Sequence, residues 1–173
     1  MSTDELGLAT AIPFTADNTT MTVRVYSPDA GIPVRLKVET VGDPTRSVET
    51  EATTTAANAW ETLTFDFANE AGGTAALNLG FVYNKASIFF NFGTTGNDAG
   101  DKTYLWDDVT FVGGGGGLSQ IDLPITFDDP TVDYTVVDFG GNATTLVADP
   151  TNGSNTVAST NKPLGSELWQ APR

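Results

Sequence analysis

The chain has 173 residues, with 22 Asp and Glu against 8 Lys and Arg, which gives a formal net charge of −14. It contains no His and no Cys. This excludes Ser-His-Asp and Cys-His catalytic centres, zinc sites built from imidazole or thiolate, and disulfide bonds. Because a strongly acidic surface repels phosphate backbones, we expect no nucleic-acid partner.

The hydropathy pattern is typical of a water-soluble globular domain. No apolar run in the sequence approaches the roughly 18 residues that a membrane-spanning helix needs, so we expect no membrane segment. Residues 1–5 are polar and acidic and do not resemble a signal peptide. At this length we expect one domain, or at most two small ones.

Alternation of apolar and polar residues predicts strands over most of the chain. The apolar residues that would face the core in the first strands are Met21, Val23 and Val25, then Val34, Leu36 and Val38, then Leu63, Phe65 and Phe67. A strand at 87–92 would place Ile88, Phe90 and Phe92 on one face and Phe89 and Asn91 on the other. Further strands are predicted over residues 104–111, 121–127, 134–139, 145–148 and 156–159.

Turn residues separate these strands about every 8 to 12 positions, and the chain holds 18 Gly and 9 Pro. No segment has a helical period long enough to form a stable helix. We therefore predict an all-β protein, a β-sandwich of about ten to twelve antiparallel strands.

Five consecutive glycines, Gly113 to Gly117, interrupt the pattern and are typical of a flexible linker. They divide the chain into parts of 112 and 56 residues. The shorter part is too small for a stable all-β core of its own without metal or disulfide support. It must therefore complete the longer part, in the same molecule or in a neighbour.

Residues 22–39, 53–67 and 104–111 resemble the middle and end of a carbohydrate-binding-module-like jelly roll. Residues 123–134 resemble the start of such a domain, where an apolar strand ends in Phe followed by an acidic residue. The resemblance covers nearly the whole chain in swapped order, as circular permutation or a cut within tandem repeats would produce. It implies a jelly-roll sandwich from a secreted, extracellular bacterial polysaccharide-degrading or surface protein.

In this interpretation residues 1–173 form one domain. Residues 1–112 supply the middle and end of the repeat, 113–117 the linker, and 118–173 the start. The strand after the linker should then lie antiparallel beside the 104–111 strand. Closure within one chain gives a monomer, whereas exchange of 118–173 between two copies gives a strand-swapped dimer, and the sequence leaves both open.

Two acidic pairs, Asp107 with Asp108 and Asp128 with Asp129, are candidate metal ligands. The resemblance implies that the first and last strands lie side by side and that acidic residues from both bind a structural Ca²⁺. Carboxylates and backbone carbonyls are the hard oxygen ligands that calcium requires. The alternative is that these four residues are solvated turn residues of an acidic chain.

Seven residues are candidates for binding a ligand, because flat aromatic rings can stack on pyranose rings and planar polar groups can bind hydroxyls. Most of these seven residues would lie on one outward face, on two strands that we expect to be neighbours. Trp169 would lie at the edge of this face. The set is Arg24, Tyr26, Arg35, Lys37, Phe89, Asn91 and Trp169. The alternative for the strand residues is a solvated face with cross-strand charge pairs. Trp169 would otherwise pack at a seam, and Trp60 and Trp106 are expected to pack.

Catalysis is not expected, since no carboxylate lies in an apolar sequence setting that would raise its pKa for an acid role. The sequence thus predicts a non-catalytic carbohydrate-binding module, stabilised by calcium, for a polysaccharide such as a β-glucan or a marine algal glycan. A structural or adhesive repeat of a cell-surface protein is the alternative.

Overall fold

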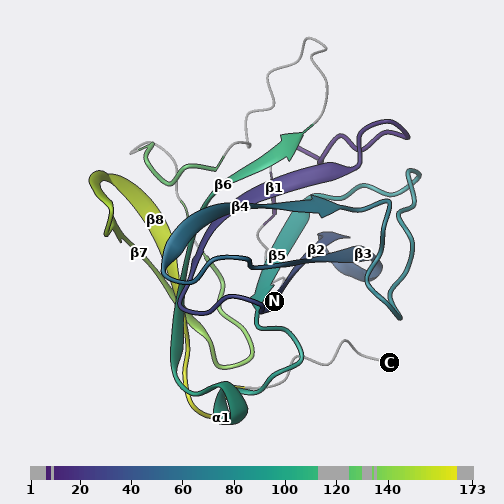
Figure 1. The fold of residues 1–173 in the computed structure, drawn as a ribbon. Helices are drawn as coiled ribbons and strands as arrows, with labels where there is room; N and C mark the ends of the chain where they lie inside the picture. Colours follow the sequence, from purple (N-terminus) through teal and green to yellow (C-terminus); the bar gives the residue numbers. More distant parts are fainter. Residues whose placement is uncertain (1–6, 9, 113–124, 130–133, 135, 167–173) are drawn as a thin grey trace, which may run out of the picture.

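A computed structural model of the chain describes residues 7–8, 10–112, 125–129, 134 and 136–166. The fold is all-β, as predicted, with eight strands and one short helix within these residues (Figure 1). In chain order the elements are β1 (Thr20–Ser27), β2 (Pro33–Thr40), β3 (Asp43–Thr53), β4 (Ala59–Asp66), β5 (Lys85–Phe90), α1 (Gly96–Ala99), β6 (Lys102–Val112), β7 (Ala143–Asp149) and β8 (Asn152–Lys162).

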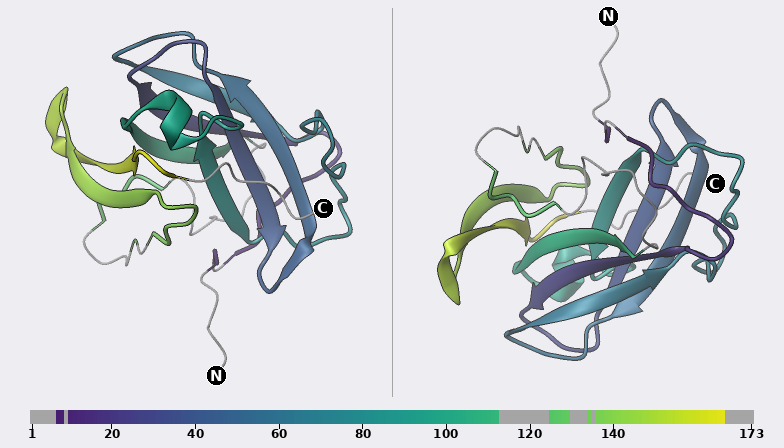
Figure 2. Two further views of the ribbon diagram at one scale, coloured as in Figure 1. Left: turned by 90° about the horizontal axis from the view of Figure 1, so that it is seen from below. Right: turned by 90° about the horizontal axis from the view of Figure 1, so that it is seen from above.

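The strands form two antiparallel sheets that pack as a sandwich (Figures 1 and 2). The five-stranded sheet has the order β4-β1-β6-β8-β7, and the three-stranded sheet has the order β3-β2-β5. The chain changes sheet between β1 and β2, and again between β3 and β4. Consecutive strands therefore often lie in opposite layers, which decides where the candidate site residues fall.

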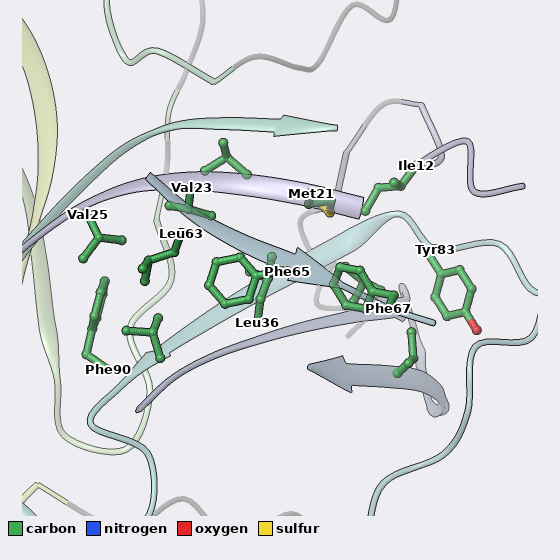
Figure 3. Close-up of a cluster of buried hydrophobic side chains, with 14 of the residues drawn as sticks. Ile12, Met21, Val23, Val25, Leu36, Leu63, Phe65, Phe67, Tyr83 and Phe90 are labelled. Carbon is green, nitrogen blue, oxygen red and sulfur yellow. The ribbon is translucent and has the colours of Figure 1, made fainter. Parts of the chain in front are cut away.

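The core lies between the two layers, and the predicted alternation is confirmed there. Met21, Val23 and Val25 of β1 are fully buried, and Val34 and Val38 of β2 face them from the other sheet. Phe65 and Phe67 fill the centre (Figure 3). Each large apolar side chain that is buried in this way contributes about 1.5–3 kcal/mol.

β3 is a strand that the sequence pattern did not predict. It is an edge strand paired only with β2 in its sheet, and it contains Pro44, Arg46 and several Thr residues. Three consecutive residues, Val48, Glu49 and Thr50, are buried in it. In such a strand, buried and exposed side chains do not alternate at every second residue, because its side chains are buried partly by ion pairs and partly by a loop that crosses the strand.

The predicted strands at 145–148 and 156–159 are confirmed as parts of β7 and β8. β8 pairs antiparallel with β6, from Lys102 opposite Lys162 to Trp106 opposite Ala158. The part of the chain after the glycines thus completes the five-stranded sheet. Of the predicted strand at 121–127, residues 121–124 lie outside the described residues, and Ile125 forms a single antiparallel bridge with Val109 of β6.

The predicted strand at 134–139 is wrong for its described residues, which have no strand structure. The rings at its two ends instead pack separately: Tyr134 on Phe127, with ring centroids 5.4 Å apart, and Phe139 on Phe89, 5.0 Å apart. Aromatic burial at two different places bends the segment over the sandwich, and this outweighs its β propensity.

Lys162 at the end of β8 joins the two parts of the chain. Its ammonium group is buried and donates hydrogen bonds to the backbone oxygens of Phe90 (3.2 Å), Asn91 (3.2 Å) and Thr94 (2.7 Å). Burial lowers the pKa of this lysine below its ordinary value.

Among the described residues, no helix is long and apolar enough to cross a membrane.

Candidate functional site

The predicted ligand-binding residues do not lie on one face. β1, which carries Arg24 and Tyr26, belongs to the five-stranded sheet, whereas β2, which carries Arg35 and Lys37, belongs to the three-stranded sheet. The expectation that these strands are neighbours is therefore wrong, because the chain crosses to the other layer after β1. Trp169 lies outside the described residues.

On the three-stranded sheet, basic and acidic side chains pair with one another. The Arg35 guanidinium binds Glu49 (2.9 Å) and Glu51 (2.8 Å), while Lys37 and Lys85 both bind Glu39. Burial would raise the pKa of Glu39, but hydrogen bonds from the two lysines outweigh burial and lower it. Three cations thus face three carboxylates, which is the cross-strand charge pairing that the sequence left open as an alternative.

Phe89 and Asn91 are also engaged within the molecule. Phe89 is only 7% exposed, and its ring lies 5.8 Å from that of Phe92 and 5.0 Å from that of Phe139. Asn91 has a φ of 49°, and its carbonyl accepts a hydrogen bond from Lys162. Their surroundings form a small pocket lined by phenylalanine rings and Lys162. Neither residue presents an open surface for a polysaccharide.

The five-stranded sheet has a different outer surface, formed by Arg24, Tyr26, Trp60 and Asp149, which we call the aromatic–arginine cluster. Tyr26 on β1 lies directly opposite Trp60 on β4, and their ring centroids are 5.7 Å apart in an edge-to-face arrangement. The Arg24 guanidinium lies 4.2 Å from the centroid of the Trp60 ring. Arg24, Tyr26 and Trp60 are half-buried, so each keeps part of its side chain accessible.

Asp149, from the end of β7, contacts both Trp60 and Arg24. Its Oδ1 accepts hydrogen bonds from Trp60 Nε1 (3.1 Å) and from the backbone and hydroxyl of Thr151 (2.8 and 2.7 Å), and Arg24 Nη2 lies 3.6 Å from Oδ2. Asp149 is 2% exposed. Burial would raise the pKa of this carboxyl, but the hydrogen bonds outweigh burial and hold it below its ordinary value.

Two of the four predicted calcium ligands, Asp108 and Asp128, act electrostatically on a third, Asp107. Asp107 on β6 is 1% exposed; its two carboxylate oxygens accept from the Asp108 backbone (2.8 Å) and the Asn155 amide (3.0 Å). Burial, together with the charges of Asp108 and Asp128, raises the pKa of Asp107 despite these hydrogen bonds. Asp128 and Asp129 are both exposed, and Asp128 Oδ1 accepts a hydrogen bond from the Thr156 backbone at 2.8 Å.

The backbone at Asp108 is irregular. The pairing of β1 with β6 shifts between Thr22 and Arg24, which marks a bulge in β6, and Asp108 adopts a φ of 48°. Such a conformation is uncommon for a residue other than glycine and is found most often in Asn and Asp. Within the described part of the chain, no group of three or more acidic residues is arranged to hold a metal ion.

Trp60, Asp149 and Asn155 were not among the sequence candidates. Trp60 stands in a clean strand pattern, which predicted packing, and Asp149 precedes Pro150, which is typical of a turn. The contact of Trp60 with Asp149 joins β4 to the β7–β8 hairpin across 89 residues of the chain, and that of Asn155 joins the hairpin to Asp107 on β6. Trp106, by contrast, packs against the core as predicted.

Comparison of the chain with protein-family models, with curated proteins and with solved structures found no match.

Proposed function

We propose that the protein is a non-catalytic carbohydrate-binding module that contacts a polysaccharide through Arg24, Tyr26 and Trp60. The observation that carries the proposal is the geometry of the aromatic–arginine cluster. Two accessible aromatic rings stand side by side, and a guanidinium is held beside them by a buried carboxylate. The resemblance of the sequence to carbohydrate-binding jelly rolls supports the same function and an extracellular setting.

The chemistry of the cluster suits a sugar. Aromatic faces and edges offer apolar surface to pyranose C–H groups, and a planar guanidinium can donate to two neighbouring hydroxyls at once. Because the surface is open and small, we expect dissociation constants of about 10⁻³ to 10⁻⁶ M. β-Glucans are the first ligand class to test and marine algal polysaccharides the second. Tandem copies would add avidity.

A catalytic role is not part of the proposal, although one sequence argument against it does not hold. Asp107 has a raised pKa and Asp149 a lowered one, the kind of difference that acid–base pairs require. Both carboxyls, however, are almost completely buried and hydrogen-bonded to protein groups. A general acid or base must reach the substrate directly or through one water, so we expect no release of reducing sugar.

A structural or adhesive repeat is the second candidate. The ion pairs of the three-stranded sheet favour it, because each basic side chain described on that face has an acidic partner. The two candidates differ in one result: the repeat binds no glycan.

The proposal includes a structural Ca²⁺ bound by Asp107 and Asp128, with Asp108 beside them. The buried carboxyl of Asp107 supports this: burial, together with the charges of Asp108 and Asp128, raises its pKa, and a divalent cation would neutralise these carboxylates. The Asn155 side chain, which contacts Asp107, could contribute its amide oxygen after rotation.

Affinity electrophoresis through gels that contain individual β-glucans and algal polysaccharides tests the proposed ligand. We expect one of them to retard the protein, and Tyr26→Ala and Trp60→Ala to weaken binding about tenfold each through loss of aromatic contact. Lys37→Ala, on the opposite sheet, is the matched control and should migrate like the wild type. Absence of retardation by every glycan would favour the structural repeat.

Thermal unfolding with calcium and with a chelator tests the metal. At a free concentration of 100 times its Kd, an ion bound only to the native state adds about 2.7 kcal/mol of stability. Asp128→Ala should abolish this gain, whereas Asp17→Ala, at an exposed position, should retain it. Asp107→Asn should be more stable than the wild type in chelator, because it removes a buried charge. Identical wild-type curves in both buffers would exclude the ion.

A further inference from the structure

β7 is the outermost strand of the five-stranded sheet, paired with β8 on one side. Among the described residues, no strand pairs with its other edge. Figures 1 and 2 show the β7–β8 hairpin at the margin of the molecule. Most β7 side chains are exposed on both faces of the strand, and Leu146 is 41% exposed. The strand thus presents an open row of backbone donors and acceptors.

The hairpin is nearly free of charge in a chain that is otherwise strongly acidic. Residues 143–161 contain one ionisable side chain, that of Asp149, and this carboxyl is buried and lies beside Arg24. Apart from the one charge of Asp149, the net charge of −14 is therefore carried elsewhere. Two copies that approach each other through this hairpin bring no exposed like charges together.

The other three sheet edges carry features that block strand addition. β4 contains Glu61 and Asp66, and β3 contains Pro44 together with Arg46, Glu49 and Glu51. β5 is a six-residue strand that begins with Lys85. Charges, proline and short length on edge strands are the means by which β-proteins prevent edge-to-edge pairing. From Ala143 to Ala148, β7 has neither a charged residue nor a proline.

We propose that β7 is a self-association edge, at which β7 of one copy pairs antiparallel with β7 of a second copy. A two-fold axis at Leu146 places the two Leu146 side chains opposite each other and sets Asp149 of each copy opposite Ala143 of the other. The contact is isologous and closes after two copies. It joins two five-stranded sheets into one continuous sheet by strand addition.

A second copy fits this edge better than a partner of different chemistry. A basic partner would be attracted to the acidic remainder of the surface and not to a neutral hairpin. The antiparallel arrangement supplies matched backbone hydrogen bonds along the strand, with threonine and aliphatic side chains on both sides of the contact. Of the aromatic–arginine cluster, only the buried Asp149 belongs to β7. Pairing at β7 therefore leaves the other three side chains of the cluster to bind the ligand.

Sedimentation velocity from low-micromolar to millimolar protein tests the proposal. We expect a monomer–dimer equilibrium that reverses on dilution, and Leu146→Lys should weaken it about tenfold by placing two cations opposite each other. Ala148→Lys, at a second exposed position of β7, should act in the same direction. Leu79→Lys, at an exposed leucine outside the sheets, is the control and should dimerise like the wild type.

Two results would overturn the proposal. One is a wild-type protein that stays monomeric over the whole concentration range. The other is a dimer whose dissociation constant is the same in the wild type and in both β7 variants, with melting temperatures that also match. That result would indicate a dimer formed by exchange of residues 118–173 instead.

Discussion

Asp149 is the residue on which the aromatic–arginine cluster depends. One buried carboxylate orients the Trp60 indole through a hydrogen bond and lies beside the Arg24 guanidinium. The same oxygen that binds the indole accepts two donors from Thr151, which closes the turn between β7 and β8. The position of the cluster and the conformation of the hairpin are therefore coupled through one side chain.

Asp149→Asn should lower the free energy of unfolding by about 2 kcal/mol at pH 7, because hydrogen bonds to a charged acceptor become hydrogen bonds to a neutral one. The folded pKa of Asp149 lies below its ordinary value of 3.8. The stabilisation is therefore fully present above that value and is lost as the pH falls through the folded pKa.

Denaturant unfolding of wild type and variant between pH 7 and pH 2 measures this difference. The gap should be constant above about pH 5 and close in acid, when the wild-type carboxyl is protonated. Asp17→Asn, at an exposed position, should leave stability unchanged throughout. A gap that persists at the lowest pH would show that charge is not what Asp149 contributes.

At the residue scale, the sequence predicted part of the site. Arg24 and Tyr26 of the proposed glycan site were found from alternation, and Asp107, Asp108 and Asp128 of the proposed metal site from the resemblance; burial and the charges of Asp108 and Asp128 raise the pKa of Asp107. Trp60 and Asp149 were missed because no local pattern distinguishes them. Arg35 and Lys37 were grouped with Arg24 because alternation tells which side of a strand a residue occupies, not in which sheet the strand lies.

At the element scale, the contact of α1 with residues 163–166, which follow β8, is notably close. Gly96 donates its backbone N–H to Ser166 O at 3.1 Å, and a Cβ at position 96 would overlap the carbonyl oxygen of Pro163. Together with the three hydrogen bonds of Lys162, this contact attaches the segment after β8 to the loop between β5 and β6. The close approach leaves no room for a side chain.

Gly96→Ala should therefore destabilise the protein by about 1–3 kcal/mol through overpacking. The matched control is Gly72→Ala, since a Cβ there meets no atom within 4 Å and the backbone does not have a positive φ. Thermal unfolding compares the two variants. Equal melting temperatures for both would contradict the packing of residues 163–166 on α1.

The success of strand prediction followed the regularity of burial. β1 alternates strictly between core and surface, β2 and β4 do so over most of their length, and all three were found with the correct faces. β3 was missed since its burial does not alternate, and the segment at 134–139 was assigned wrongly because its aromatic residues pack at two separate places. Both failures come from tertiary contacts that outweigh local propensity.

At the scale of the whole molecule, the two outer faces have different chemistry. The face of the three-stranded sheet neutralises its own charges in cross-strand pairs. The face of the five-stranded sheet keeps an aromatic pair and a guanidinium accessible, and at its margin lies a hairpin almost without charge. The proposed polysaccharide site therefore belongs to the second face.

The most direct test is a ¹H–¹⁵N NMR titration with β-glucan oligosaccharides that follows the tryptophan indole signals. Trp60 Nε1 donates to Asp149 beside the proposed contact surface, whereas Trp106 Nε1 donates to Thr160 at 3.0 Å and its ring packs against the core. We predict that the Trp60 signal shifts progressively with added ligand while the Trp106 signal stays in place. Binding that leaves the Trp60 signal unmoved, or no shift anywhere in the spectrum at saturating oligosaccharide, would contradict the proposed site.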